Sequence, residues 1–237
     1  MNKFVLIACE ESQQITRRMR VLGIECYSCD ILAESGGHPE WHICGDVSDL
    51  LHGEVDFKTS DRVTHHVPRW DMIIAHPPCT YLTVTGNKWY FPNSYITLNR
   101  QGKHEEVQRI IEERKKYREL AVKFFELFVN ADCEKVAIEN PVGIMNTRYR
   151  TPDQIIQPYE FGEPVSKKTC LWLKGLPKLK PTNIVEPAPR IRFASGKSMD
   201  PWFSKGFRLS PDERSRLRSK TFDGIADAIT EQWGKII

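Results

Sequence analysis

Hydrophobic and polar positions follow two alternating patterns over the first 140 residues. Short apolar runs typical of buried strands cover residues 3–9, 24–30, 41–47, 70–76 and 134–140. Segments with apolar residues at helical spacing lie between them, at residues 10–23 and 104–131. Strands that alternate with helices, and that are apolar enough to be buried on both faces, predict an α/β fold with a doubly wound, mostly parallel, Rossmann-like sheet.

The pattern changes after residue 144. Prolines become frequent and helical spacing disappears until Ser210, so we expect a small irregular or β-rich insert there. Ser210-Pro211-Asp212-Glu213 is a good helix start, and a second helix is expected over residues 222–233. The sequence therefore predicts a core over residues 1–144, an insert over residues 145–210, and C-terminal helices over residues 211–237 that return to the core.

Charge is concentrated in the predicted insert. Residues 145–210 hold 12 Lys and Arg against five acidic residues, a net charge of +7, whereas the whole chain carries +3. A basic module on a mildly acidic body favours a polyanionic partner, most simply nucleic acid. The alternative is a solvated surface that happens to be rich in lysine.

Composition sets the class of protein. The 237 residues are 40% hydrophobic and 27% charged, which is typical of a globular domain with at most a small appendage. No run approaches the ~18–20 apolar residues of a membrane span, and the first residues lack the apolar core of a signal peptide. We expect a cytoplasmic protein with reduced thiols and no membrane partner, either a monomer or a homodimer.

The seven cysteines are an odd number spread along the chain, which argues against a disulfide framework. One group loosely follows zinc-ligand spacing: Cys26, Cys29, His38, His42 and Cys44. We favour the simpler interpretation, in which Cys26 and Cys44 are small core residues on neighbouring strands, and we expect no metal.

Ligands of such sheets bind beyond the carboxyl ends of the strands. The predicted strand ends bring five segments to this edge: Cys9-Glu10-Glu11-Ser12, Asp30, Asp46, His76–Cys79 and Glu139-Asn140. An acid at the end of the second strand is placed to bind ribose hydroxyls, and one after the third strand to reach an adenine amino group. Either acid could instead cap a helix.

Cys79 stands on a stiff turn, because Pro77 and Pro78 cannot continue a strand. A thiol exposed at a ligand-binding edge is a candidate nucleophile, although a buried, inert cysteine is the common alternative. Glu139 ends the neighbouring strand, where a carboxyl that stays protonated could donate a hydrogen bond or a proton. Together they suggest covalent attack on a nucleobase.

Two motifs carry a resemblance to a known family. Residues 78–86 read Pro-Cys-Thr-Tyr-Leu-Thr-Val-Thr-Gly, and residues 139–144 read Glu-Asn-Pro-Val-Gly-Ile. They resemble, at matching spacing, the Pro-Cys-Gln-x-Phe-Ser-x-Ala-Gly and Glu-Asn-Val-x-Gly-Leu motifs of the cytosine carbon-5 DNA methyltransferases, here as a compact, phage-type divergent member. The resemblance covers about residues 3–144 and 219–234.

The resemblance implies a mechanism. The Cys79 thiolate would add to carbon 6 of a flipped cytosine in DNA, most simply double-stranded, while Glu139 binds ring nitrogen N3 and carbon 5 takes a methyl group from S-adenosylmethionine. Lys168, or with less support Lys167, would hold the base oxygen O2. Cofactor contacts would come from Cys9, Glu10, Glu11, Ser12, Asp30, Asp46 and Pro77, and substrate contacts from Pro78, Thr83, Gly86, Asn140 and Lys167.

The first turn departs from the family, because Cys9–Gln13 contains none of the glycines of the family's Phe-x-Gly-x-Gly-Gly. This keeps open RNA, a free nucleotide or a modified donor as alternatives within the same fold. A non-catalytic DNA-binding relative is an alternative of a different class.

Overall fold

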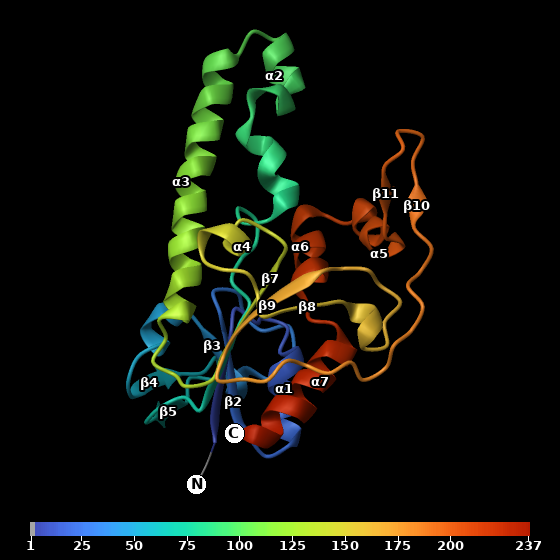
Figure 1. Ribbon diagram of the computed structural model, residues 1–237. Coiled ribbons are helices and arrows are strands. Elements are labelled where there is room, and N and C mark those ends of the chain that lie inside the picture. The colour runs from blue at the N-terminus through green and yellow to red at the C-terminus, as the bar shows by residue number, and fades with distance from the viewer. Residues whose placement is uncertain (1–2) are drawn as a thin grey trace.

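The computed structural model describes residues 3–237. Its centre is a seven-stranded sheet in the order β3-β2-β1-β6-β7-β9-β8 (Figure 1). The strands are β1 (Phe4–Ala8), β2 (Glu25–Asp30), β3 (His42–Cys44), β6 (Met72–Ala75), β7 (Val136–Pro141), β8 (Gln154–Ile156) and β9 (Thr169–Lys174). The first five pair in parallel, and β9 runs antiparallel to both of its neighbours. The mostly parallel α/β sheet is confirmed, and it is compatible with a Rossmann-like fold.

The strand order reverses between β1 and β6. From β1 the chain builds outward through β2 to β3, and it then returns to place β6 and β7 on the other side of β1. Such a switch point opens a crevice at the carboxyl ends of the two strands, where open α/β sheets bind their ligands. The turns after β1 and β6 therefore lie where a ligand-binding site is expected in this fold.

Both faces of the sheet are covered. On one face Val5 and Ile74 pack with Ile15 of α1 (Gln14–Val21) and Trp233 of α7 (Asp223–Trp233). On the other face the neighbouring strand residues pack under α3 (His104–Val129), which contributes Phe125 and Phe128. Alternate residues of one strand thus enter two cores, which explains the continuous apolar runs in the sequence.

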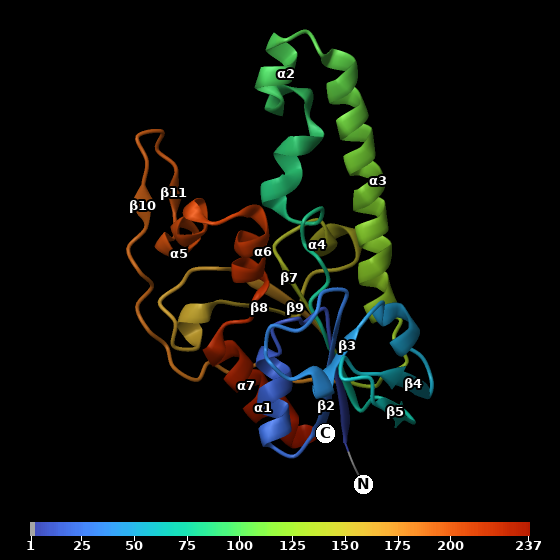
Figure 2. The same cartoon turned by 180° about the vertical axis from the view of Figure 1, so that it is seen from behind.

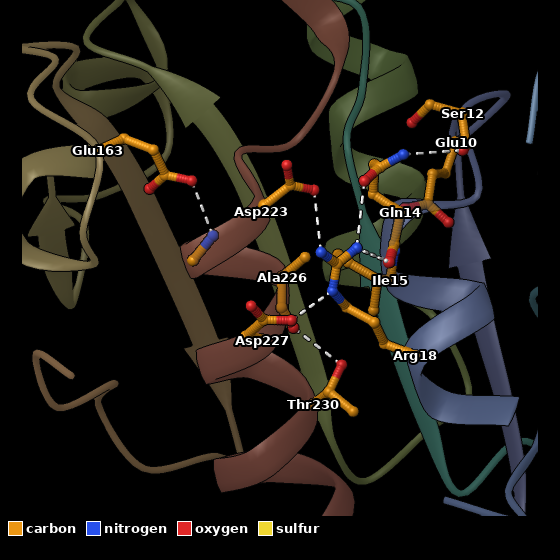
Figure 3. A network of polar contacts seen from close by, with 11 residues as sticks. Glu10, Ser12, Gln14, Ile15, Arg18, Glu163, Asp223, Ala226, Asp227 and Thr230 are labelled. Carbon is orange, nitrogen blue, oxygen red and sulfur yellow. Dashed lines mark hydrogen bonds and ion pairs between the residues drawn. The ribbon is translucent and has the colours of Figure 1, made fainter. Parts of the chain in front are cut away.

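Ion pairs join α1 to α7 at the edge of the first core. The Arg18 guanidinium bonds both Asp223, at 2.9 Å, and Asp227 (Figure 3). The two helices, far apart in the sequence, lie side by side. This contact brings the C-terminal segment back to the sheet.

Helix α1 begins four residues later than the sequence predicts. Cys9 and Gln13 have φ values of 60° and 53°, the left-handed region that favours glycine. Residues 10–13 consequently form a turn instead of the first turn of a helix. The other long helix, α3, begins at the predicted residue and ends two residues early.

Two features were not expected from the sequence. One is a hairpin of β4 (Val55–Lys58) and β5 (Thr64–Val67). The other is a helical arm, residues 84–118, which comprises two 3₁₀ segments, α2 (Ile96–Arg100) and the first half of α3. Figures 1 and 2 show it in green, projecting away from the sheet. Its base is held by aromatic contacts, with the Arg118 guanidinium 3.5 Å from the Tyr90 ring centre.

The structure shifts the boundary of the insert. After α4 (Met145–Arg148), strands β8 and β9 join the central sheet, so the part outside the sheet starts only after Lys174. It holds the short strands β10 (Ile191–Arg192) and β11 (Ser198–Met199) and helix α5 (Pro201–Ser204). Helix α6 (Pro211–Ser219) then begins as predicted, with Ser210 and Glu213 forming a reciprocal cap.

The five Cys and His residues with zinc-like spacing do not converge. Cys26 and Cys29 point to opposite faces of β2 and enter different cores. Cys44, expected in the core, is exposed, because its position follows the buried Ile43 at the end of a short edge strand. Within residues 3–237, no three His, Cys, Asp or Glu residues are grouped so as to hold a metal ion. In the same range, no helix has the length and apolarity needed to cross a membrane.

Candidate active site at the carboxyl edge of the sheet

Cys79 lies on a defined turn directly after β6. The backbone N–H of His76 still donates to the Ala8 carbonyl of β1, at 2.9 Å. The chain then leaves the sheet through the two prolines, and the N–H groups of Leu82 and Thr83 donate to the Cys79 carbonyl at 3.0 and 3.1 Å. The thiol is half-buried. The expected stiff turn is therefore present, with Cys79 at its apex.

The Cys79 loop is fastened to the loop that follows Glu139. Ile144 N–H donates to the Leu82 carbonyl at 2.8 Å, and Val84 N–H donates to the Val142 carbonyl at 3.2 Å. A Cβ atom at Gly143 would lie 2.1 Å from the Leu82 oxygen, so this approach requires glycine. The two motifs that carry the family resemblance thus form one structural unit.

Asn140 adds a side-chain contact to this unit. Its amide nitrogen donates to the Pro77 carbonyl at 2.7 Å, which ties the end of β7 to the proline turn. Thr83 pairs with Gly143 across the two loops, and its hydroxyl accepts from the Gly86 N–H at 3.2 Å. Of the residues expected to contact substrate, Asn140, Thr83 and Gly86 therefore shape the loop, and Pro78 lies exposed beside Cys79.

The charges near the Cys79 thiol have opposite effects on its pKa. Burial and the negative charge of Glu139 raise the pKa of the Cys79 thiol, whereas the positive charges of Lys167 and Arg218 lower it less. The resting side chain is consequently a thiol at neutral pH. Attack on a substrate requires that its proton be taken away.

Glu139 is paired with His76. The His76 Nδ1 atom lies 3.3 Å from Glu139 Oε2, at the ends of the adjacent strands β6 and β7. Burial raises the pKa of Glu139, but the hydrogen bond and charge of His76, helped by Lys167, lower it further, to below its usual value. The sequence suggested a protonated Glu139. That suggestion is corrected: the lowered pKa favours a carboxylate at Glu139, hydrogen-bonded to His76.

Lys167, not Lys168, reaches this place. A small cavity of about 30 Å³ is lined by His76, Glu139, Lys167 and Phe222, among others. The Lys167 Nζ atom donates to the Arg218 carbonyl at 2.9 Å and lies 5.5 Å from the Phe222 ring centre. Lys168, the favoured candidate from the sequence, is exposed, because successive residues of an extended segment point in opposite directions.

Two buried polar atoms at this site have no hydrogen-bond partner among the described residues. They are His76 Nε2 and Asn140 Oδ1, two of only four such side-chain atoms in residues 3–237. The Asn140 residue is 2% exposed. Because buried polar groups are almost always paired, such atoms indicate a place where a ligand or ordered water completes the bonding.

Cys9, Asp30 and Asp46 lie together at the opposite side of the switch point. Burial raises the pKa of Cys9 well above its usual value, and the charges of Asp30 and Asp46 raise it further. Asp30 accepts from the Leu32 N–H at 2.9 Å, and Asp46 caps the 3₁₀ turn over residues 47–50 by accepting from Ser48 N–H at 2.8 Å. The two acids therefore occupy the expected strand ends and also serve as local caps.

Glu10 does not face the crevice as the sequence led us to expect. It is 3% exposed, and its carboxylate accepts from the Ile15 N–H at 2.7 Å and from the Thr16 hydroxyl at 2.8 Å. Burial raises the pKa of Glu10, although the charge of His76 opposes this. The side chain fills the anion-binding position at the start of α1, where a glycine-rich turn would admit a ligand. Its assignment as a cofactor contact is not supported.

The neighbouring polar residues are also bonded within the protein. The Glu11 carboxylate accepts from the Ser35 hydroxyl, and Gln13 exchanges hydrogen bonds with the His38 backbone at 2.9 and 3.1 Å. Ser12 is buried, and its carbonyl accepts from the Gln14 amide. Residues 31–38 are in this way fastened over the first turn.

No protein-family model matches the sequence, and no curated protein matches it significantly. The geometry of the carboxyl edge therefore carries the functional argument.

Proposed function

We propose that the protein is an S-adenosylmethionine-dependent methyltransferase that modifies carbon 5 of cytosine in DNA through a covalent Cys79 adduct on a flipped base. One observation carries the proposal. The Cys79 loop and the Glu139 loop are clamped together at the ends of adjacent parallel strands, with Lys167 beside them. A nucleophile, an acid and a cation thus converge where an open α/β sheet binds ligands.

The chemistry uses these groups in sequence. Cys79 loses its proton, and the thiolate forms a bond to carbon 6 of the cytosine. The electron pair of the 5,6 double bond is displaced through the ring to N3, which gains a proton by way of the Glu139 carboxylate. Carbon 5 becomes nucleophilic. After methyl transfer it loses its proton to solvent, the sulfur–carbon bond breaks to release the Cys79 thiolate, and the double bond is restored. Lys167 would bind O2 and stabilise the charge that develops on the ring.

The sheet supports the cofactor assignment. The seven-stranded, mostly parallel sheet has a switch point between β1 and β6, where open α/β sheets bind their ligands. Asp30 and Asp46 would hold the ribose and adenine groups, and Pro77 is buried directly after β6, beside the switch point. When bound, the cofactor supplies the methyl group that carbon 5 takes. Because the Glu10 carboxylate occupies the start of α1, the amino-acid end of the cofactor would bind differently here than at a glycine-rich turn.

The surfaces beside the site fit DNA. The helical arm follows Cys79 directly and carries eight Lys and Arg against four acidic residues. Its Phe91 side chain is 62% exposed. The segment after Lys174 adds a second basic surface. A duplex bound between them would contact cations through its phosphates.

The cavity of about 30 Å³ is smaller than a pyrimidine ring, so residues 219–222 would have to shift when a flipped base enters.

The test is methyl transfer by the purified protein with labelled S-adenosylmethionine. We expect 5-methylcytosine in duplex DNA, identified by mass spectrometry of the hydrolysed nucleosides. Label in RNA or free nucleotide only would establish the alternative substrates. DNA binding without methylation of any substrate would favour a non-catalytic relative. Absence of S-adenosylmethionine binding at millimolar ligand in calorimetry would reject this donor.

A further inference from the structure

Four titratable side chains stand in a row across the carboxyl edge. Following the order of the strands, Glu10 stands after β1, His76 after β6, Glu139 at the end of β7 and Lys167 before β9. The proposed chemistry uses Glu139 and Lys167, and Glu10 is occupied at the start of α1. His76 stands between the two acids and has no role so far.

His76 is held in place but incompletely bonded. Its side chain is 10% exposed, and Nδ1 lies 3.3 Å from Glu139 Oε2. The other ring nitrogen, Nε2, is buried and has no hydrogen-bond partner in residues 3–237. A histidine that served only to fill the core would not need a carboxylate at one ring nitrogen. It would also not leave its other ring nitrogen buried without a hydrogen-bond partner.

Acids and cations approach His76 from every element around it. The acids are Glu10 from the first turn and Glu139 from β7. The cations that line the same cavity are Lys167, before β9, and Lys220, between α6 and α7. Cys79 lies three residues further along the loop, with Arg218 also close to its thiol. His76 therefore faces two acids and two cations.

We propose that His76 holds the proton that Glu139 delivers to the substrate, and that it fixes the orientation of the Glu139 carboxyl. This inference rests on the proposed function, because it assigns a role within that reaction. His76 is a positioning residue that acts through Glu139, since its bonded nitrogen faces the carboxylate and not the substrate.

The proton balance is closed. In the resting pair His76 is protonated and Glu139 is a carboxylate. When Cys79 sulfur bonds to carbon 6, His76 Nδ1 passes its proton to the Glu139 carboxylate and Glu139 passes it on to N3, which leaves His76 neutral and Glu139 again a carboxylate. When the sulfur leaves, N3 returns its proton to the pair. The protons lost by the Cys79 thiol and by carbon 5 go to solvent, and the pair needs no other source.

The test is the rate of adduct formation on duplex DNA containing 5-fluorocytosine, with S-adenosylmethionine, between about pH 5.5 and 10.5. The productive form needs both a thiolate at Cys79 and a proton on the His76–Glu139 pair, which gives the wild type a bell-shaped profile. His76→Gln retains a hydrogen-bond donor but holds no mobile proton. We expect its rate to be about 10²-fold lower and its falling limb to be absent.

A matched control is His66→Gln. His66 also pairs with a carboxylate, at 2.9 Å from Asp56, but on the exposed β4–β5 hairpin. We expect the wild-type profile for this variant. Chemical rescue supplies a second measurement: His76→Ala should regain rate with added imidazole, and less with 1,2,4-triazole, which has a similar shape and is much less basic.

The outcomes separate the two proposals. A wild-type protein that forms no adduct at any pH overturns the proposed function, and the role of His76 with it. An adduct that forms normally, with a bell-shaped profile retained in folded His76→Gln or with equal rescue by both azoles, overturns the role of His76 alone.

Discussion

The two turns that face each other across the switch point use their polar groups in opposite ways. In the turn after β1, the side chains of Glu10, Glu11 and Gln13 are all bonded within the protein. In the turn after β6 and its neighbour after β7, His76 Nε2 and Asn140 Oδ1 are buried without partners. An unpaired buried polar group costs about 1–3 kcal/mol. The protein therefore keeps the free-energy cost of unpaired buried polar atoms on the β6–β7 side. On the β1 side, hydrogen bonds within the protein have removed this cost.

This difference separates a turn that mainly stabilises the fold, after β1, from the turns that can take part in a reaction, after β6 and β7. The β1 side is a closed hydrogen-bonded frame whose left-handed residues are supported by their neighbours. The β6–β7 side is incomplete until something binds. Substitutions on the first side should act mainly on stability, and substitutions on the second mainly on reaction rate.

The largest expected effect is at Cys79. Cys79→Ala should lower methyl transfer by at least about 10³-fold, because no other thiol stands on the clamped loop, while the unfolding midpoint in urea changes little. Cys9→Ala, on the other side of the switch point, should remain measurably active. Comparable losses in both folded variants would contradict the comparison.

Glu139→Gln should give the next largest loss. We expect methyl transfer about 10²-fold slower, because the amide cannot pass a proton to N3. Steady-state kinetics should place the loss in kcat more than in the KM for DNA. A folded Glu139→Gln with wild-type kcat would remove Glu139 from the mechanism.

Gly143→Ala tests the clamp between the two loops. The added Cβ would meet the Leu82 oxygen at 2.1 Å, so the loops must separate. We expect a loss of about 1–3 kcal/mol in the free energy of unfolding and a slower adduct rate. Gly45→Ala is the control, since a Cβ there meets nothing within 4 Å. Equal stability of both variants would show that the clamp is loose.

Glu10→Ala should affect stability alone. It removes the acceptor for Ile15 N–H and the Thr16 hydroxyl, at an expected cost of about 1–2 kcal/mol in urea unfolding. Adduct formation by the folded variant should stay within a few-fold of wild type. A loss as large as that of Glu139→Gln would instead give Glu10 a role in the reaction.

The pH dependence of stability should have opposite signs at the two acids. The pKa of Glu139 is lowered from 4.5, so its contribution is complete above about pH 4.5 and is lost as pH falls through the lowered value. The pKa of Glu10 is raised from 4.5, so its contribution is largest below about pH 4.5 and declines as pH rises through the raised value. Urea unfolding of wild type, Glu139→Gln and Glu10→Gln across pH measures both. Slopes of the same sign would contradict the assignment.

Sequence patterns predicted the parallel strands because those strands are buried on both faces and are continuously apolar. They missed the β4–β5 hairpin, in which His65 and His66 interrupt the apolar run. They also missed the arm, whose contacts are arginine–aromatic pairs between distant residues.

The site was predicted unevenly for a related reason. The spacing of the two motifs located Cys79 and Glu139. The roles of Lys167 and Glu10 depended on which way one side chain points, and a lone histidine before two prolines gave no spacing signal for His76. These features depend on the tertiary structure, which local sequence patterns do not encode.

The most direct test of the central claim is peptide mapping of the adduct by mass spectrometry. The protein is incubated with S-adenosylmethionine and duplex DNA containing 5-fluorocytosine, denatured and digested. The account predicts a single modified peptide carrying the nucleotide on Cys79, and none from Cys79→Ala. An adduct on another cysteine, or methylated DNA without any trapped adduct, would contradict it.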